Sequence, residues 1–456
     1  MTAKRVFKKL RKFLAVTGVG LAFGLSVTIT YLEQANRQGL HDVKLQLKAA
    51  GMPLKPEELQ APLPPAAENA APLYVQLTQL LKAKPLAGTD KVLDDGSKNY
   101  PASAERIAQL RTALQHRQDI LQLVHQAAAR PRFVFTRDYA QGPYLLLPEY
   151  APMRAGLRIL TRESLVLLAD GKPLDAIRNE TLGFHMAQHA AADSILIAKL
   201  VGVALNTMTL RFMERVLYTA GDQPGVAQAV ADTIAQNWKL VNMADGMRGE
   251  VILGEVVCDM IRAGKFHEGS FKNGNGVSRH SSLYKALVDA NELDLLSHLN
   301  TEIKLMKQPY AEGISGMEAL AQDIEIHNNL PTHLLTSVLW PVFSQARAKQ
   351  AQGEAQAATV RASAQALAYH QQHRVFPDSL ETVVSPLPLD PFAANISKSS
   401  DGKMEGTPLH YQREDNGFSI YSVGPTGKFS GGTTLHKPDS RETVFHFPMP
   451  AYYLQK

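Results

Sequence analysis

The chain opens with a short polar stretch and then an unbroken run of apolar and small residues, FLAVTGVGLAFGLSVTITYL, at positions 13–32. These residues include no charged side chain. A helix of about 20 residues rises about 30 Å, which matches the hydrocarbon core of a bilayer. Six basic residues precede the run, and basic residues favour the cytoplasmic side. The pattern therefore predicts a transmembrane signal anchor with its N-terminus inside.

Two alternatives remain for this segment. A cleaved signal peptide has a shorter apolar region, about 7–15 residues, and a small-x-small cleavage site, which VTITYLEQ does not offer. A soluble amphipathic or core helix is the other alternative. We favour the anchor, which makes residues 1–12 a cytoplasmic basic segment. The bulk of the chain is then expected on the periplasmic, extracytoplasmic side of a cell inner membrane.

Residues 33–73 follow the anchor and change character midway. Residues 33–50 are polar and helix-prone, whereas residues 51–74 contain six prolines. Because proline cannot donate a backbone hydrogen bond, we expect an extended segment with a short helix near PEEL. We interpret residues 33–73 as a stalk and linker that spaces the body from the membrane. A packed arm is the alternative, since Leu59, Leu63 and Tyr74 could be buried.

Residues 74–350 show helical periodicity and predict an irregular α-helical body. Asp170-Gly171-Lys172-Pro173 should end one helix and begin the next, because Gly favours the C-cap and Pro the first turn. Pro341 is expected to kink or break its helix. We find only a weak resemblance to tetratricopeptide hairpins and no regular repeat. The predicted fold class is mainly α.

Residues 351–456 predict a small C-terminal α+β unit. A helix ends near residue 373, and two alternating runs, PLHYQRE and FSIYSVG, flank Asp415-Asn416-Gly417. Asn-Gly between alternating runs is a strong hairpin signal. The run TVFHFP at 443–448 is expected to add a third strand.

This unit resembles the globular part of the major pseudopilins of type II secretion systems, over roughly residues 355–432. The motifs that carry the resemblance are Tyr369, Phe376-Pro377 with Leu380, Leu389-Asp390-Pro391-Phe392, Pro408-Leu409-His410-Tyr411 and Phe418-Ser419-Ile420-Tyr421-Ser422-Val423-Gly424. The whole chain also looks like a large membrane-anchored bacterial protein. The resemblance implies a helix packed on an antiparallel sheet, and a link to a secretion or envelope process.

Two departures limit what the resemblance implies. The N-terminus lacks a prepilin-type start, so we do not expect a filament subunit. The family binds calcium through Asp carboxylates in the loop after the Tyr-Ser-x-Gly strand. Here Thr426 stands where an acid is expected, Lys428 adds positive charge, and only Asp439 remains nearby. Because Ca²⁺ requires several anionic oxygens, we expect no calcium and no other cofactor.

Composition and charge refine this picture. The 456 residues are 45% hydrophobic and 20% charged, which is ordinary for a globular protein. The net charge of +5 comes from residues 1–32, because the remainder has 42 basic and 43 acidic side chains. No nucleic-acid surface is therefore expected. A single cysteine, Cys258, excludes an internal disulfide and is expected in the core.

The candidates for chemistry are few. His185 and His189 in HMAQH have a metal-ligand spacing, but Met186 replaces the glutamate of the zinc motif, and a packing role is favoured. The carboxylates of Glu250, Glu255 and Asp259 could act as acid and base. Ion pairs with Arg248 or Arg262 are the favoured interpretation.

The sequence also contains one long interior loop and lacks the common catalytic motifs. The loop at 265–282 carries His267, Glu268 and His280, for which solvation is favoured over a binding lid. No nucleophile elbow, Walker motif or CxxC pair occurs in the sequence. We therefore expect a membrane-anchored interaction or scaffold protein, with envelope proteins as possible partners. An extracytoplasmic hydrolase or metalloenzyme that uses His185 and His189, or Glu250 and Glu255, is the alternative.

Overall fold

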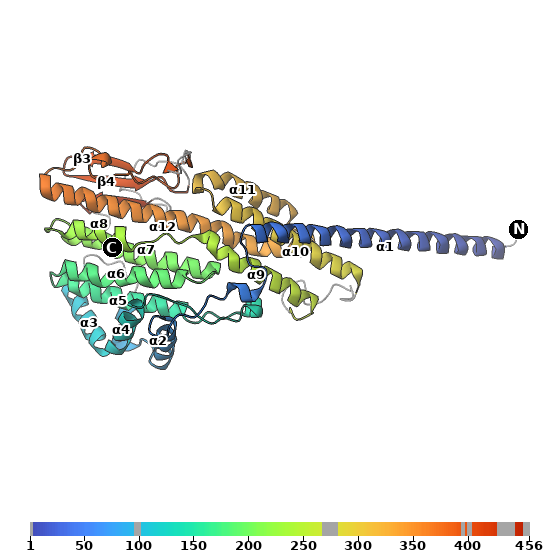
Figure 1. The fold of residues 1–456 in the computed structure, drawn as a ribbon, viewed down its shortest axis with the longest axis horizontal. Coiled ribbons are helices and arrows are strands. Elements are labelled where there is room, and N and C mark those ends of the chain that lie inside the picture. The colour runs from blue at the N-terminus through green and yellow to red at the C-terminus, as the bar shows by residue number, and fades with distance from the viewer. Residues whose placement is uncertain are drawn as a thin grey trace.

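The computed structural model describes residues 3–94, 102–266, 281–393, 397–398, 404–425 and 443–449. Residues 3–25, 339–344, 397–398 and 404–405 are described by their backbone alone. The described chain is mainly helical and carries a small antiparallel sheet near its C-terminus, as the sequence predicts (Figure 1).

The helices and strands follow one another in a simple order. The helices are α1 (Ala3–Ala49), α2 (Ala71–Ala83), α3 (Ala104–His116), α4 (Gln118–Ala128), α5 (Tyr150–Ala169), α6 (Pro173–Ala191), α7 (Leu196–Ala220), α8 (Val226–Asn237), α9 (Met243–Arg262), α10 (Ser282–Met306), α11 (Tyr310–His327) and α12 (Leu334–His373). The strands are β1 (Ser397–Lys398), β2 (Met404–Glu405), β3 (His410–Glu414), β4 (Gly417–Ser422) and β5 (Thr443–Phe447). Short 3₁₀ turns cover Pro56–Leu59, Gly88–Leu93, Tyr139–Tyr144 and Leu380–Thr382.

The hairpin of α5 and α6 shows how local sequence sets these boundaries. α5 ends at Ala169, Gly171 has a φ of 72°, and Pro173 is the first residue of α6. Glycine adopts this left-handed conformation without the steric cost of a Cβ atom, and proline fits the first helical turn. The predicted turn is therefore confirmed.

Helix α1 is one continuous helix of 47 residues. Its C-terminal part packs along α10, while the rest extends away from the other helices (Figure 1). Leu40, Val43 and Leu47 are buried in a core that includes residues of α9 and α10. Their spacing of three and four residues places them on one face of the helix.

Part of the segment expected to act as a spacer packs against the body. Met52, Leu59 and Tyr74 are buried, whereas Leu63 is exposed. The Gln60 side chain donates to the Phe135 carbonyl at 3.0 Å. Residues 40–59 thus carry apolar side chains that the body buries, which favours the packed-arm alternative for this part of residues 33–73, whereas residues 61–67 are mostly exposed. The 3₁₀ turn at Pro56–Leu59 is the short helix expected near PEEL.

Helix α12 joins the helical body to the C-terminal sheet. It runs from Leu334 to His373 and includes Pro341, so the expected break at that proline is absent. It also passes through residue 350, where the sequence pattern predicts the boundary between body and C-terminal unit. One side of α12 meets α7 and α8, and the sheet packs on another (Figure 1).

The C-terminal sheet has the order β3-β4-β5, and its strand pairs are antiparallel. The turn between β3 and β4 follows Glu414 and ends at Gly417, and β5 is the expected third strand. Phe418 and Phe445 lie in the same hydrophobic core as residues of α5, α6 and α7. Tyr218 of α7 stacks on Phe445 with ring centroids 4.8 Å apart. The body and the sheet therefore share one core.

The described residues include one helix that is long and apolar enough to cross a membrane by length and composition, α7 (Leu196–Ala220). Most of its apolar stretch is buried inside the body, so α7 is a core helix in this fold. The predicted anchor at 13–32 lies mostly in the part of α1 that is described by its backbone alone, and it stays a prediction.

Candidate functional site

His185 and His189 both lie on α6, and both make packing contacts. The Nε2 atom of His189 is 2.8 Å from the Arg130 carbonyl, and its Nδ1 atom is 3.1 Å from the Tyr74 hydroxyl. Burial lowers the pKa of His189 to about 4, so the ring is neutral at pH 7. The Nδ1 atom of His185 lies 3.3 Å from the Ala128 carbonyl. These contacts tie the end of α4 to α6 and occupy both ring nitrogens of His189.

The three carboxylates singled out on α9 do not converge. Glu250 accepts a hydrogen bond from the Leu196 backbone N–H at 3.0 Å, at the start of α7. Burial raises its pKa to about 7. Glu255 turns to α1, and Asp259 pairs with Arg262 at 3.0 Å. Arg248 donates to the Gly51 carbonyl instead of to a carboxylate.

Other predicted sites fall outside the described residues. His267, Glu268 and His280 lie in the segment 267–280, and the loop residues Thr426, Lys428 and Asp439 lie in 426–442. Within the described ranges, no group of His, Cys, Asp and Glu side chains is arranged to hold a metal ion. Cys258 is buried, as expected of a core residue.

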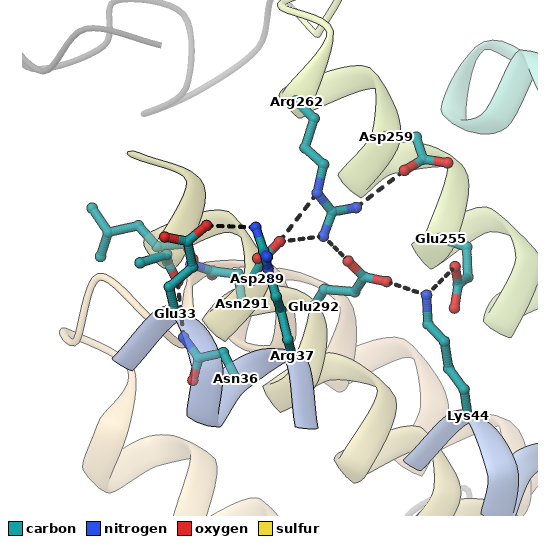
Figure 2. Close-up of polar contacts among 12 residues, drawn as sticks. Glu33, Asn36, Arg37, Lys44, Glu255, Asp259, Arg262, Asp289, Asn291 and Glu292 are labelled. Carbon is teal, nitrogen blue, oxygen red and sulfur yellow. Dashed lines mark hydrogen bonds and ion pairs between the residues drawn. The ribbon is translucent and has the colours of Figure 1, made fainter. Parts of the chain in front are cut away.

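The most concentrated group of charges joins α1, α9 and α10, and we call it the α1 clamp (Figure 2). The Lys44 ammonium of α1 lies 2.9 Å from a Glu255 oxygen and 2.7 Å from a Glu292 oxygen. The Arg262 guanidinium pairs with the other Glu292 oxygen and with Asp289 at 2.7 Å. Glu292 therefore lies between two cations that come from different helices.

Burial sets the energetics of the α1 clamp. The Glu292 side chain is 1% exposed, whereas those of Lys44 and Arg262 are about one-third exposed. A carboxylate removed from water needs nearby cations or a proton. Burial lowers the pKa of Lys44, but its contacts with Glu292 and Glu255 outweigh burial and hold it above the ordinary value. Burial also raises the pKa of Glu255.

Amide side chains extend the α1 clamp along the helix pair. Asn36 donates to the Ala286 carbonyl at 3.0 Å, and Asn300 donates to the Gln46 side chain at 2.8 Å. A Cβ atom on Gly39 would come within 2.7 Å of the Leu293 side chain, so the two helices approach closely at this point. Polar and apolar contacts thus hold α1 in one register against α10.

Sequence reasoning missed Lys44 and Glu292. A signal was present, because Leu40, Val43 and Leu47 recur at helical spacing within the segment interpreted as a polar stalk. That spacing predicts a buried face, and a buried face brings the neighbouring Lys44 close to another element. The partner carboxylates are more than 200 residues away in sequence, and no local pattern identifies them.

Two further clusters of charged and polar side chains link elements of the body. The Arg137 guanidinium pairs with Glu149 and Asp193, and the Tyr150 hydroxyl donates to Asp193 at 3.0 Å. At the corner of α10, α11 and α12, His298 lies 3.3 Å from Asp294 and 3.4 Å from Asp323. Burial lowers the pKa of His298, but these carboxylates raise it to about 9.

Some of the residues quoted for the pseudopilin resemblance contact one another in the C-terminal unit. Asp390 is fully buried and accepts hydrogen bonds from the Ser422 hydroxyl at 2.7 Å and the Val423 backbone N–H at 2.8 Å. The Tyr411 hydroxyl donates to the Pro377 carbonyl at 2.6 Å. A groove of about 250 Å³ lies beside β3 and is lined by Asp378, Ser379, Leu380, Glu381, Leu387, Thr407, Pro408, Leu409, His410 and Tyr411.

Comparisons of the chain with protein-family models, with curated proteins and with solved structures found no match in any of the three. The pseudopilin resemblance therefore rests on the sequence motifs alone and stays a prediction.

Proposed function

We propose that the protein is a single-pass, membrane-anchored extracytoplasmic protein that acts as an interaction or scaffold module in an envelope process. Its N-terminal segment would span the inner membrane, and its helical body would face the periplasm. The single observation that carries this proposal is the course of α1. One helix includes the charge-free residues 13–32 and continues without interruption into the α1 clamp.

The positions of the candidate catalytic side chains support the interaction role over the enzyme alternative. His185 and His189 link α6 to the segment after α4, and Glu250 caps the start of α7. Glu255 belongs to the α1 clamp. Each of these groups therefore has a packing partner among the described residues.

The C-terminal unit supports an envelope role through its resemblance. α12 packed on a three-stranded antiparallel sheet is the arrangement that the pseudopilin motifs imply. The shared core with α7 fixes this unit to the body, so a partner bound to the unit would be held at a set position relative to the anchor.

Fractionation and protease protection test the proposal. The full chain with a C-terminal tag should sediment with inner membranes, resist extraction by high salt or carbonate, and lose the tag to protease added to spheroplasts. A periplasmic reporter fused after residue 456 should be active, and a cytoplasmic one inactive. Recovery of the intact chain in the soluble cytoplasm would overturn the proposal.

The intact mass of the membrane-extracted protein separates the anchor from a cleaved signal peptide. An uncleaved anchor retains residues 13–32, whereas a mature chain that starts beyond Tyr31 contradicts the anchor. A matched control replaces residues 1–32 with a cleavable signal peptide. That variant should be released as soluble periplasmic protein, because the α1 clamp begins only after this segment.

A further inference from the structure

The end of the body formed by α9 and α10 lies level with the end of the predicted membrane span. Asn36 contacts Ala286, Lys44 contacts Glu292, and Gln46 contacts Asn300, so α1 and α10 run in the same direction. Ser282, the first residue of α10, lies four residues before Ala286, and Leu32 of α1 lies four residues before Asn36. Four residues correspond to a rise of about 6 Å along either helix. The start of α10 is therefore level with Leu32.

The end of α9 lies at the same level. The Tyr284 hydroxyl near the start of α10 donates to the Ile261 carbonyl at 3.1 Å. α9 then ends at Arg262, and the chain turns through Gly264 to Lys265. The exposed residues Lys265, Leu283 and Lys285 all belong to this end of the body, which we call the α9–α10 tip.

The headgroup layer on each side of a bilayer is about 5–8 Å thick, the difference between a hydrocarbon core of about 30 Å and a total of about 40–45 Å. If residues 13–32 fill the core, the first turn of α1 beyond Leu32 crosses the headgroup layer. Because α1 is continuous there and is clamped to α10 from Asn36 onward, the α9–α10 tip has no hinge that would lift it from the membrane.

We propose that the α9–α10 tip is a lipid-contact surface that rests in the headgroup layer of the outer leaflet of the inner membrane. This inference rests on the proposed function, because it requires α1 to be inserted. The side chain of Leu283 is 40% exposed and enters the interface between headgroups and acyl chains. The Lys265 and Lys285 ammonium groups lie beside anionic lipid phosphates. Arg37 and Asp259 of the same region are paired with Glu33 and Arg262.

Fluorescence quenching in the membrane tests this surface. The full chain is reconstituted in vesicles of phosphatidylethanolamine and phosphatidylglycerol that include a headgroup-spin-labelled lipid. A dye is attached through Leu283→Cys, through Tyr31→Cys as the insertion control, or through Asp222→Cys at the opposite end of the body. The unmodified protein controls for labelling of Cys258, which is buried.

The expected result is strong quenching at positions 31 and 283 and none at position 222. Quenching at 31 without quenching at 283 overturns the lipid-contact surface while the anchor stands. Absence of quenching at both 31 and 283 overturns the anchor together with the surface. Because α1 holds the tip at a fixed depth, the lysines act on which lipids gather there. In the Leu283→Cys background, Lys265→Glu with Lys285→Glu should therefore reduce quenching at 283 by headgroup-labelled phosphatidylglycerol more than by labelled phosphatidylethanolamine, and leave quenching at 31 unchanged. Equal quenching at 283 with and without these charge reversals would overturn the role of the two lysines.

Discussion

Glu180 and Glu292 are two carboxylates that are almost completely removed from water. Glu180 lies in the core between α5 and α6, and Glu292 lies in the α1 clamp. The cost of burying the carboxylate is offset differently at the two sites. The Glu180 carboxylate accepts from the Thr161 hydroxyl at 2.9 Å, and burial raises its pKa to about 8. Glu292 has the cations Lys44 and Arg262 as partners. A bound proton is thus the main compensation for burial of Glu180. For Glu292, the compensation comes from two cations, one on α1 and one on α9.

This difference separates a site that only packs from a site that joins elements. The neutral form of Glu180 needs no cation from another helix, only the hydroxyl of Thr161 on the neighbouring helix α5. The charge of Glu292 depends on α1, because Lys44 belongs to that helix. The attachment of α1 therefore contributes directly to the solvation of a charge in the body.

Removal of the charge at position 292 is the strongest test of this difference between Glu180 and Glu292. Glu292→Gln keeps the side-chain shape but leaves Lys44 and Arg262 with one anion fewer in a half-buried region. We expect the free energy of unfolding to fall by about 3 kcal/mol, the lower end for a broken buried pair. Urea unfolding at pH 7.5 measures it. Glu318→Gln on the exposed face of α11 is the matched control, and equal stability of the two variants would contradict the comparison.

Removal of the carboxylate at position 180 is expected to raise the free energy of unfolding, not to lower it. A carboxyl whose pKa is raised on folding contributes stability that is complete below its unfolded value, near 4.5, and is lost as the pH rises through about 8. Glu180→Gln removes this loss and keeps an acceptor for Thr161. The variant should be about 2 kcal/mol more stable than the natural protein at pH 6, about one and a half pH units above the unfolded value. The two proteins should be equally stable at pH 4, and a stability difference that does not change with pH would contradict the raised pKa.

Loss of Lys44 should act mainly on α1. Lys44→Met keeps the apolar stem and removes the ammonium, while Arg262 still compensates Glu292. We expect a loss of about 1 kcal/mol, typical of a partly exposed charged hydrogen bond. Amide hydrogen exchange should rise in residues 40–49 more than in α6 or α7. Lys48→Met, one turn away and exposed, provides the control, and uniform acceleration across the body would argue against a local role.

The smallest effect is expected from Arg37. Its guanidinium pairs with Glu33 within α1, four residues away, and is largely exposed. Such pairs contribute about 0.5 kcal/mol or less. Thermal unfolding of Arg37→Ala should therefore match the natural protein closely. A loss as large as that of Lys44→Met would show that the α1 clamp extends to residue 37.

Local chemistry made much of the fold predictable. The Gly171 turn, the short helix at Pro56 and the hairpin after Glu414 each depend on residues adjacent in sequence. Pro341 does not break α12, so the loss of one backbone hydrogen bond at a proline did not by itself decide where this helix ends.

The candidate site was harder to predict, for a physical reason. The partners of Lys44 lie on α9 and α10, and a single charged residue carries no sign of a partner so distant in sequence. His185 and His189 had a suggestive spacing, but their carbonyl partners are backbone atoms, which no side-chain pattern reveals. Burial of Leu40, Val43 and Leu47 was not predicted because polar residues dominate the segment 33–50, whereas burial of Leu59 was kept as an alternative.

The uninterrupted backbone of α1 also fixes how the body is rotated about the axis of this helix. Each residue of an α-helix turns the chain by about 100° and advances it by about 1.5 Å. One residue inserted after Leu32 would therefore swing everything beyond it by more than a quarter of a revolution while raising it by little more than a bond length. With residues 13–32 inserted in the bilayer as proposed, the number of residues between positions 32 and 36 would decide which flank of the protein is presented to neighbours in the plane of the membrane.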